Sequence, residues 1–269
     1  MGGLGNQLFQ IFATISYAIK VKQGFHFLYT EFLGKRQTYW NTFLFPLKGF
    51  TSTRSLGNTT ILQEQDFGYN ELPILQNNEQ SISLYGYFQS CKYFDTYYDT
   101  ICKLIRLKTQ QNNITQTYYH NYDKLISMHF RLGDYKLLQE YHPIMTYTYY
   151  FNSIQHIIST TNHSELHILY FCEKEDNAIV QETIKELSKA FPLCKFIKAF
   201  DTITDWEQML MMSCCRHNII ANSTFSWWGA YFNGHADKIV CYPNIWFGPK
   251  NPVSTHDLFP ESWIKLNCA

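Results

Sequence analysis

The carboxyl-terminal half of the chain alternates between short apolar runs and longer amphipathic runs. Runs typical of buried strands cover residues 125–130, 166–171, 194–199, 218–221 and 238–241. Between them, apolar residues recur at helical spacing over residues 148–159, 175–190, 205–215 and 224–233. Strands that alternate with helices of this length form parallel crossover units. The pattern therefore predicts an α/β domain built on a doubly wound parallel sheet.

The amino-terminal part has a weaker pattern. A glycine-rich opening, Gly2-Gly3-Leu4-Gly5, is followed by apolar residues at helical spacing as far as Ile19, which predicts an amphipathic helix. Two strands are predicted at residues 25–29 and 82–88, and a second helix at residues 91–105.

A polar stretch over residues 110–117 has no apolar period and separates the two parts. A chain of 269 residues is long for one core and fits two domains. We therefore predict an amino-terminal α/β domain of residues 1–117 and a Rossmann-like carboxyl-terminal domain of residues 118–269.

The composition narrows the classes of partner. Lys plus Arg and Asp plus Glu number 22 each, and we see neither the basic excess nor the basic stripe of a nucleic-acid-binding protein. Aromatic residues make up 17% of the chain and could provide walls for a ring-shaped ligand. None of the eight cysteines forms a Cys-x-x-Cys pair, which favours reduced thiols.

Two further observations bear on location. Met1 runs directly into the glycine block without a signal peptide, and no apolar run approaches the length of a membrane span. We expect no transmembrane segment, and a cytoplasmic protein whose contact with a membrane, if it has one, is peripheral.

The first candidate site follows the apolar run at 125–130. His129, Arg131 and Asp134 cluster around Gly133, where a strand gives way to a polar turn. The carboxyl ends of strands in an open α/β sheet are where ligands bind, and the planar fork of an arginine suits a phosphate pair. The alternative is a local ion pair between Arg131 and Asp134 that closes the loop.

The second candidate site begins where the run at 218–221 ends. Asn222, Ser223, Thr224 and Ser226 stand at the start of a predicted helix, where hydroxyl groups and backbone N–H groups favour an anion. The alternative is that Asn222 or Ser223 only caps the helix and that Trp227 and Trp228 only fill the core. Both sites lie at strand ends of one predicted sheet, so together they could hold a diphosphate.

The chain lacks several motifs of other chemistries. It contains no Asp-x-Asp for a bridging metal, no His/Cys cluster with zinc spacing, no phosphate loop of the ATPase type and no Gly-x-Ser-x-Gly elbow. The glycine block is a poor dinucleotide fingerprint because Leu8 replaces the third glycine, which disfavours a dehydrogenase. The alternative for the glycine block is a turn that starts a helix and binds no ligand. Exposed amides at Asn6 and Gln7 would nevertheless suit sugar hydroxyls.

Three blocks resemble, in order, the signature blocks of the α-1,2-fucosyltransferases, glycosyltransferase family 11. They are residues 2–10 (Gly-Gly-Leu-Gly-Asn-Gln-Leu-Phe-Gln), 129–135 (His-Phe-Arg-Leu-Gly-Asp-Tyr) and 222–230 (Asn-Ser-Thr-Phe-Ser-Trp-Trp-Gly-Ala). The end of the chain at residues 259–264 is also similar, so the resemblance covers essentially the whole sequence. It implies a GT-B-like pair of domains that transfers L-fucose from GDP-fucose to a galactose-terminated glycan in α-1,2 linkage, with inversion, without a cofactor and without a required metal.

The resemblance also implies a role for each matched residue. Arg131 would hold the diphosphate and, with Asn6, act in catalysis, while His129 and Asp134 would shape the nucleotide pocket. The remaining matched residues would line the phosphate side (Asn222, Ser223, Thr224 and Ser226) or face the sugar from the other domain (Gly5, Asn6 and Gln7).

Two positions depart from the family pattern. Leu132 stands where many members carry a second arginine, and Gln208 stands where the family tends to carry an aspartate. The residues themselves leave a different class of function open, namely a non-catalytic protein that binds a nucleotide sugar or a glycan on the same fold.

Overall fold

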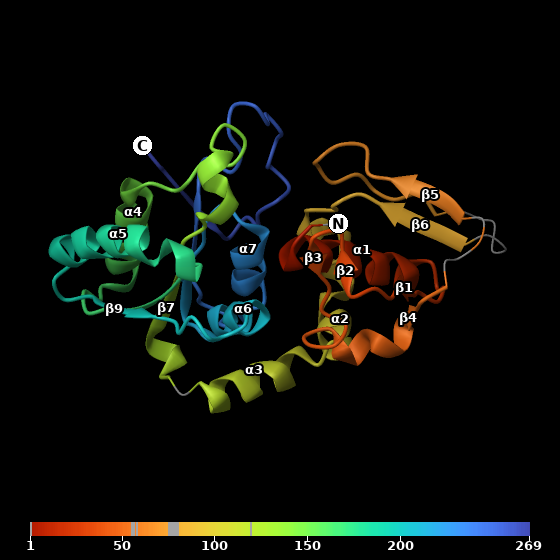
Figure 1. The fold of residues 1–269 in the computed structure, drawn as a ribbon, viewed down its shortest axis with the longest axis horizontal. Coiled ribbons are helices and arrows are strands. Elements are labelled where there is room, and N and C mark those ends of the chain that lie inside the picture. Colours follow the sequence, from red (N-terminus) through yellow and green to blue (C-terminus); the bar gives the residue numbers. More distant parts are fainter. Residues whose placement is uncertain (1, 55–56, 58, 75–80, 119) are drawn as a thin grey trace. The chain divides into compact units, whose positions relative to one another are not determined.

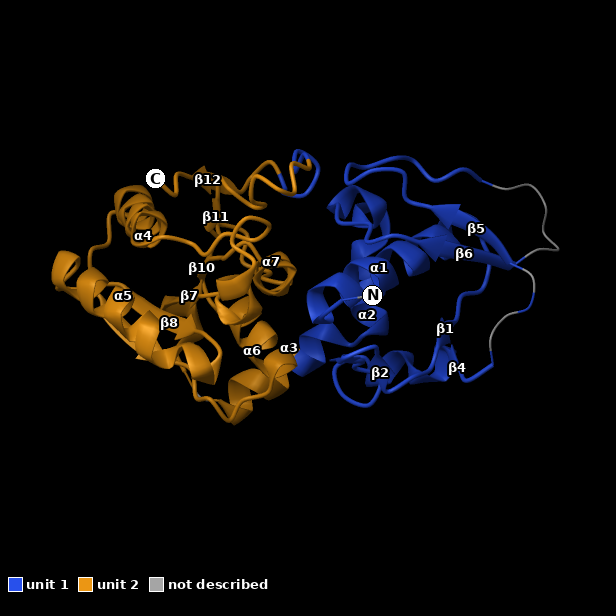
Figure 2. Ribbon diagram, turned by 45° about the horizontal axis from the view of Figure 1, so that its top comes forward, with its two compact units in different colours: residues 1–110, 254–260 blue, residues 111–253, 261–269 orange. Residues whose placement is uncertain are grey.

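The structure is a computed structural model that describes residues 2–54, 57, 59–74, 81–118 and 120–269 (Figure 1). The chain divides into two compact units. Unit 1 comprises residues 1–110 and 254–260, and unit 2 comprises residues 111–253 and 261–269 (Figure 2). The predicted boundary at 117/118 lies seven residues after the division between the units.

Unit 2 contains a six-stranded parallel sheet in the order β12-β11-β10-β7-β8-β9. Its strands are β7 (Leu125–His129), β8 (His167–Phe171), β9 (Lys195–Lys198), β10 (His217–Ile219), β11 (Val240–Pro243) and β12 (Ile264–Leu266). Five of the six were predicted from the apolar runs. From the β9 edge the order in the chain is third, second, first, fourth, fifth, sixth, which is the doubly wound order of dinucleotide-binding sheets.

Four helices connect these strands in the predicted places. They are α4 (Tyr147–Thr161), α5 (Asn177–Ala190), α6 (Asp205–Cys214) and α7 (Thr224–Tyr231). Because the strand order runs outward from β7 in both directions, right-handed crossovers place α4 and α5 on one face of the sheet and α6 and α7 on the other (Figure 2). The predicted fold class, α/β and GT-B-like with a doubly wound second domain, is confirmed.

The core of unit 2 explains why β7 lies at the centre of the sheet. All five of its residues are buried, as expected for a parallel strand covered on both faces. A buried amide fixes its neighbour: Asn218 on β10 donates to Ser127 Oγ at 2.7 Å and accepts from Asn233 Nδ2 at 2.8 Å. This polar network ties β7, β10 and the segment after α7 together, so the two central strands are held to each other at their middle residues.

Unit 1 is built around α1 (Leu4–Lys20), which was predicted from its apolar period. Its strands form pairs: β1 (Phe27–Leu28) with β4 (Thr51–Ser52), β2 (Phe32–Leu33) with β3 (Arg36–Gln37), and β5 (Thr59–Gln63) with β6 (Ser81–Tyr85). The predicted strand at 25–29 therefore shrinks to β1, and the predicted strand at 82–88 shifts to β6.

The middle of the chain differs in local structure from the sequence pattern. The polar stretch at 110–117, near which the domain boundary was predicted, belongs to α3 (Leu107–Thr117), whose buried residues Leu107 and Ile114 stand two turns apart. The predicted helix at 91–105 is broken into two 3₁₀ turns followed by α2 (Tyr98–Leu104). In α3, Gln111 contacts the rest of the unit through a hydrogen bond, because its side chain donates to Ser213 Oγ at 2.9 Å. Polar contacts of this kind leave no hydrophobic period in the sequence.

Candidate functional site

The strand order identifies one place in unit 2 where a ligand would bind. In a doubly wound sheet the crevice lies outside the carboxyl ends of the two strands at which the chain order reverses. Those strands are β7 and β10, which pair directly, with Met128 opposite Ile219. The segment after β7 contains Arg131 and Asp134, and the segment after β10 contains Asn222 and Ser223, all of which were singled out from the sequence. The two predicted half-sites therefore flank one switch point.

Arg131 leaves β7 and is held by two carboxylates. One terminal nitrogen of its guanidinium donates to Asp134 and the other to Glu173, which follows β8. The Arg131 side chain is 19% exposed, whereas the Asp134 and Glu173 side chains are 47% and 48% exposed. A guanidinium has five N–H donors, so these two hydrogen bonds leave capacity for a further acceptor on the fork. The local ion pair expected as an alternative is present, with a second carboxylate that was not predicted.

The loop that carries Arg131 is braced by the segment after β8. Gly133 has φ +38°, where any other residue would be strained, and a Cβ at this position would lie 2.7 Å from Glu173 Oε2 and displace that carboxylate. Its N–H donates to the buried carboxylate of Asp176 at 2.8 Å, and Asp176 also forms an ion pair with Lys136. The direction of the Arg131 side chain is therefore fixed from two strand ends.

Two histidines beside this loop are uncharged at neutral pH. Burial, with a smaller contribution from the Arg131 cation, lowers the pKa of His129 to about 3. Burial also lowers the pKa of His142 below its usual range, Asp134 opposes this shift and Arg131 adds to it. Neither imidazole adds positive charge to the site near pH 7.

The residues predicted as the second candidate site lie at the turn after β10, and they make different kinds of contact. Ser223 is the N-cap of α7 and accepts from Phe225 N at 3.4 Å, while the buried Ser226 hydroxyl lies 3.3 Å from Ser223 O inside the first turn. Thr224 is the first residue of the helix. Asn222 donates to Pro143 O at 2.9 Å and to Trp246 O at 3.1 Å. The expected capping role is thus confirmed for Ser223, and Ser226 is committed to the helix backbone.

Two buried polar atoms at this switch point have no hydrogen-bond partner in the described structure: His129 Nδ1 and Asn222 Oδ1. His129 lies at the end of β7 and Asn222 three residues after the end of β10. Buried polar groups are normally hydrogen-bonded, so a donor or acceptor left over on each side of the switch point indicates a ligand or an ordered water there.

Tyr135 joins the two half-sites. Its ring centroid lies 5.0 Å from Cζ of Arg131, and its hydroxyl donates to Asn222 O at 3.2 Å. The His142 ring stacks on the same tyrosine at 4.8 Å. The structure therefore brings together Arg131, Asp134, His129 and the turn at Asn222, as the sequence predicted. It adds Tyr135, His142 and Glu173, which the sequence analysis did not single out.

The third group of predicted residues belongs to unit 1. Gly5, Asn6 and Gln7 lie in the first turn of α1, and Gly5 and Gln7 are buried. The Gln7 amide donates to Gly2 O at 3.1 Å and to Gln37 O at 2.8 Å, and Asn6 Oδ1 accepts from Gln89 Nε2 at 3.1 Å. These contacts fix both amides within unit 1, and their role toward a sugar stays a prediction.

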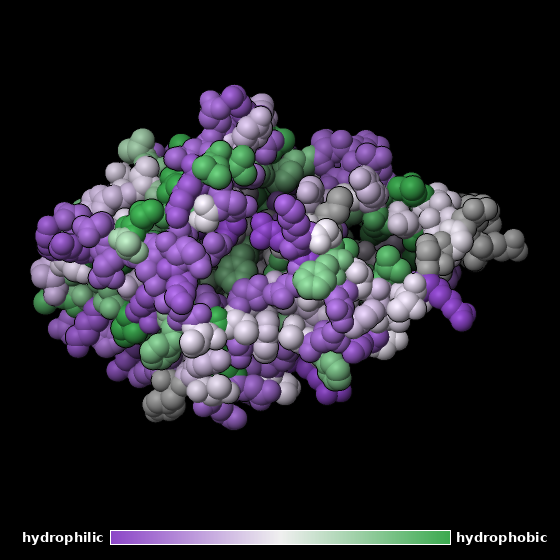
Figure 3. Space-filling model, in the orientation of Figure 1, coloured by the Kyte–Doolittle hydropathy of each residue, from purple (hydrophilic) through white to green (hydrophobic). Residues whose placement is uncertain are grey.

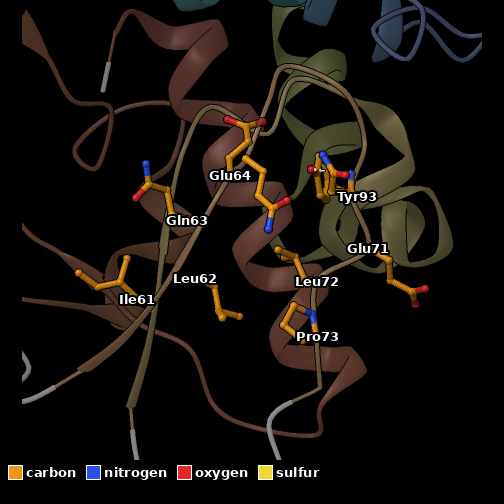
Figure 4. A pocket seen from close by; sticks show the side chains of 10 residues that line it. Ile61, Leu62, Gln63, Glu64, Glu71, Leu72, Pro73 and Tyr93 are labelled. Atoms are coloured by element: carbon orange, nitrogen blue, oxygen red, sulfur yellow. Dashed lines mark hydrogen bonds between the residues drawn. The ribbon is translucent and has the colours of Figure 1, made fainter.

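Unit 1 also contains a pocket of about 710 Å³ beside β5 (Figure 4). Glu64 and Tyr93 are among its lining residues, and none of the residues predicted from the sequence lines it. Burial raises the pKa of Glu64, whose carboxylate accepts from the N–H groups of Tyr87 at 2.6 Å and Phe88 at 2.8 Å. Glu64 therefore holds the turn after β6, which accounts for its burial without a ligand.

Within the described residues there is no cluster of three or more His, Cys, Asp or Glu side chains arranged to hold a metal ion. No helix found there is long and apolar enough to cross a membrane.

The fold and the switch point together indicate a class of domain. A doubly wound sheet with a fixed arginine after its first strand and a capped helix after its fourth is a nucleotide-binding type of domain. The sequence then places the protein more closely: a model of the family described as Glycosyl transferase family 11 matches residues 59–267. The chain belongs to this glycosyltransferase family.

Two relatives from Escherichia coli are similar to the chain. The O-antigen biosynthesis glycosyltransferase WbnK is 28% identical over 98% of this chain and 98% of its own length. An alpha-1,2-colitosyltransferase is 29% identical over 52% of this chain and 47% of its own length. Among solved structures, a mutant of Arabidopsis thaliana FUT1 in complex with GDP has a TM-score of 0.46 at 12% identity, over 100% of this chain and 75% of that chain. The E. coli ADP-heptose heptosyltransferase II has a TM-score of 0.39 at 10% identity, over 59% and 43% of the two chains.

Proposed function

We propose that this family 11 glycosyltransferase moves L-fucose from GDP-fucose to a galactose-terminated glycan, in α-1,2 linkage and with inversion. The donor, the acceptor and the linkage come from the resemblance of the three sequence blocks to the α-1,2-fucosyltransferases. The observation that carries a nucleotide-sugar role is the meeting of Arg131 and the start of α7 at one switch point, joined through Tyr135.

Arg131 is the proposed contact to the diphosphate. Its two terminal nitrogens are already oriented by Asp134 and Glu173, so the fork does not have to be ordered when the donor binds. Preorganised donors of this kind act mainly on charge that develops in the transition state. In the proposed reaction that charge builds on the GDP phosphate as the bond from the anomeric carbon to the phosphate oxygen breaks.

The first turn of α7 is the proposed second contact to the phosphates. Thr224 begins a helix whose backbone N–H groups and dipole favour negative charge. Beside it, the unpartnered His129 Nδ1 can donate to a phosphate oxygen, whereas the unpartnered Asn222 Oδ1 can only accept and would face a hydroxyl or N–H group of the donor. A neutral His129 suits this role because it can donate one hydrogen bond without titrating at physiological pH.

We propose that transfer needs no metal. The chain has no Asp-x-Asp that would bridge a metal to the diphosphate, and Arg131 with the helix start would neutralise the leaving group instead. Asn6 remains the proposed catalytic residue of unit 1, and Gly5 and Gln7 its neighbours toward the acceptor.

A transfer assay tests this function directly. Purified protein is incubated with GDP-fucose and a panel of β-galactosides, GDP release is measured, and the product linkage is determined by NMR. A new α-1,2-linked fucosyl galactoside is the expected product. Release of GDP with no acceptor-dependent product, or a product linked elsewhere, would refute the proposal.

Two other outcomes are informative. GDP-fucose that binds but does not turn over with any acceptor would support the non-catalytic binding protein left open by the residues. The colitosyltransferase among the relatives motivates GDP-colitose as a second donor in the same assay. A strong preference for GDP-colitose would leave the proposed phosphate contacts unchanged but would replace fucose by colitose as the transferred sugar.

A further inference from the structure

One region of unit 1 departs from the balanced charge of the chain. Residues 22–54, called here the basic-aromatic face, contain a single acidic residue, Glu31, whereas the whole chain has equal numbers of acidic and basic residues. The basic residues of this face are all exposed: Lys22, Lys35, Arg36, Lys48 and Arg54. The balanced total conceals this stretch, which is why our sequence analysis found no basic surface.

The β2–β3 hairpin is the most exposed part of the face. All residues from 31 to 37 are exposed, and the strands pair with Leu33 opposite Arg36 across a turn at Gly34, whose φ is +63°. Phe32 is 60% exposed and Leu33 38%. The hairpin thus presents two large apolar side chains directly beside Lys35 and Arg36. Figure 3 shows a hydrophobic group over the part of unit 1 where Figure 1 draws β2 and β3.

Further apolar side chains surround a second cation of the face. Phe45 is 61% exposed, and Lys48 Nζ lies 5.9 Å from its ring centroid and 5.6 Å from that of Tyr29. Phe50 is 40% exposed and stacks on Phe25 at 4.7 Å. Exposed aromatic rings and basic residues thus occur together outside the hairpin as well, with Phe45 near Lys48 as the recorded contact.

The hairpin is held in place from its base. Gln7 in the first turn of α1 donates to Gln37 O at 2.8 Å, and Thr38 N donates to Glu31 O at 2.9 Å. Large exposed apolar groups on such an ordered segment mark an interaction surface.

We propose that the basic-aromatic face docks on an anionic lipid bilayer. Basic residues next to an anionic surface are attracted to its headgroups, and neighbouring Phe and Leu side chains can enter the boundary of the acyl chains. The single carboxylate among the basic groups favours a negatively charged partner, and the apolar side chains between them favour a lipid surface over a nucleic acid. This inference does not depend on which sugar the protein transfers.

Vesicle sedimentation tests the proposal. Full-length protein is mixed with phosphatidylcholine vesicles that contain phosphatidylglycerol and, in parallel, with pure phosphatidylcholine vesicles. Binding is expected only to the first, and it should weaken as the salt concentration rises above about 0.15 M, where the Debye length is about 8 Å. Combined Lys35→Ser and Arg36→Ser substitutions should lower the partition coefficient about 30-fold, because each basic residue contributes about 1 kcal/mol at such a surface.

Matched controls separate the face from general charge and hydrophobicity. Lys185→Ser with Lys189→Ser removes two exposed cations from α5, and Leu193→Ser with Phe200→Ser removes exposed apolar groups from unit 2. Neither control pair should change vesicle binding. Phe32→Ser with Leu33→Ser should weaken it about tenfold or more while leaving the melting temperature and GDP release with a soluble acceptor unchanged.

Five results would overturn the proposal. Wild-type protein could stay in the supernatant with both kinds of vesicle. The hairpin variants could sediment like wild type. The control variants could lose as much vesicle binding as the hairpin variants lose. A concentration-dependent dimer that the hairpin variants abolish would assign the face to a second copy of the chain, and preferential binding to single-stranded RNA would assign it to nucleic acid.

Discussion

Replacing Arg131 by lysine should abolish transfer nearly as completely as replacing it by alanine. Lysine keeps the positive charge but offers a single ammonium, which cannot span Asp134 and Glu173 and also present a fork to the diphosphate. Loss of one preorganised donor of this kind reduces turnover by roughly 10²–10³, about 3–4 kcal/mol. GDP affinity should fall less, because the interaction is strongest when charge develops on the leaving phosphate.

The structure sets a limit on how much stability the same changes remove. Both carboxylate partners of Arg131 are nearly half exposed, so each ion pair contributes at most about 1 kcal/mol. For a chain of this size, 1 kcal/mol corresponds to about 2–4 °C in melting temperature. Arg131→Ala should therefore lower the melting temperature by less than about 8 °C and remain folded at assay temperature.

Arg216 provides the matched control for this experiment. It stands just before β10, at the opposite end of the sheet, and forms an ion pair with Asp237. Arg216→Ala should lose a comparable small amount of stability and keep turnover near wild type. Turnover, GDP affinity and melting temperature are measured on the same preparations. Near-normal turnover of folded Arg131→Ala would end the catalytic interpretation and leave Arg131 as part of a structural ion-pair cluster.

Three further outcomes are expected. Glu173→Gln removes a negative charge beside the proposed diphosphate contact and should raise GDP affinity about fivefold (~1 kcal/mol) at low salt; calorimetry that finds equal or weaker binding would contradict this. The pKa of His129 is about 3 in the folded state and about 6.5 when unfolded, so the unfolded state binds more protons between these values and stability is lost as the pH is lowered through this window. From pH 7 to pH 5 wild type should lose about 2 kcal/mol more than His129→Phe in urea unfolding, and equal losses would refute neutral burial. Transfer should survive excess EDTA, and activity that needs added magnesium or manganese would disprove the metal-free proposal.

The unit 2 sheet could be predicted because its strands are buried on both faces. Continuous apolar runs identify such strands, as the fully buried β7 shows. β12 escaped prediction because Ile264–Leu266 is a three-residue edge strand whose burial is only partial. In unit 1, β2, β3 and β4 have two residues each, and strands of such length leave no period in the sequence.

The candidate site could be predicted to the extent that it follows strand ends. Arg131 and Asn222 stand after apolar runs, and the same rule applied to β8 would have found Glu173, two residues after Phe171. Gln7 could not be resolved in this way. Its amide is committed to Gln37 O, thirty residues away, through a hairpin that the sequence pattern did not indicate.

The charge balance around Arg131 has a consequence for how the diphosphate would be held. Leu132, where many family members carry a second arginine, is 5% exposed and packs in the core cluster of unit 2 with Met128 and Tyr150. An arginine with this orientation would bury its charge among apolar side chains, which is costly without a partner. Arg131 therefore faces two carboxylates without an arginine neighbour, and this group of three side chains carries a net negative charge.

A net negative cluster attracts a diphosphate only through the geometry of its donors. In the proposed donor complex, the N–H groups left on the Arg131 fork would act together with the first turn of α7, whose dipole is part of the fold and independent of any side-chain charge. Binding that rests on directed donors more than on net charge should depend weakly on salt. Gly133, Glu173 and Tyr135 together fix the orientation of Arg131, so in the proposed complex a diphosphate would meet a fork that is already oriented.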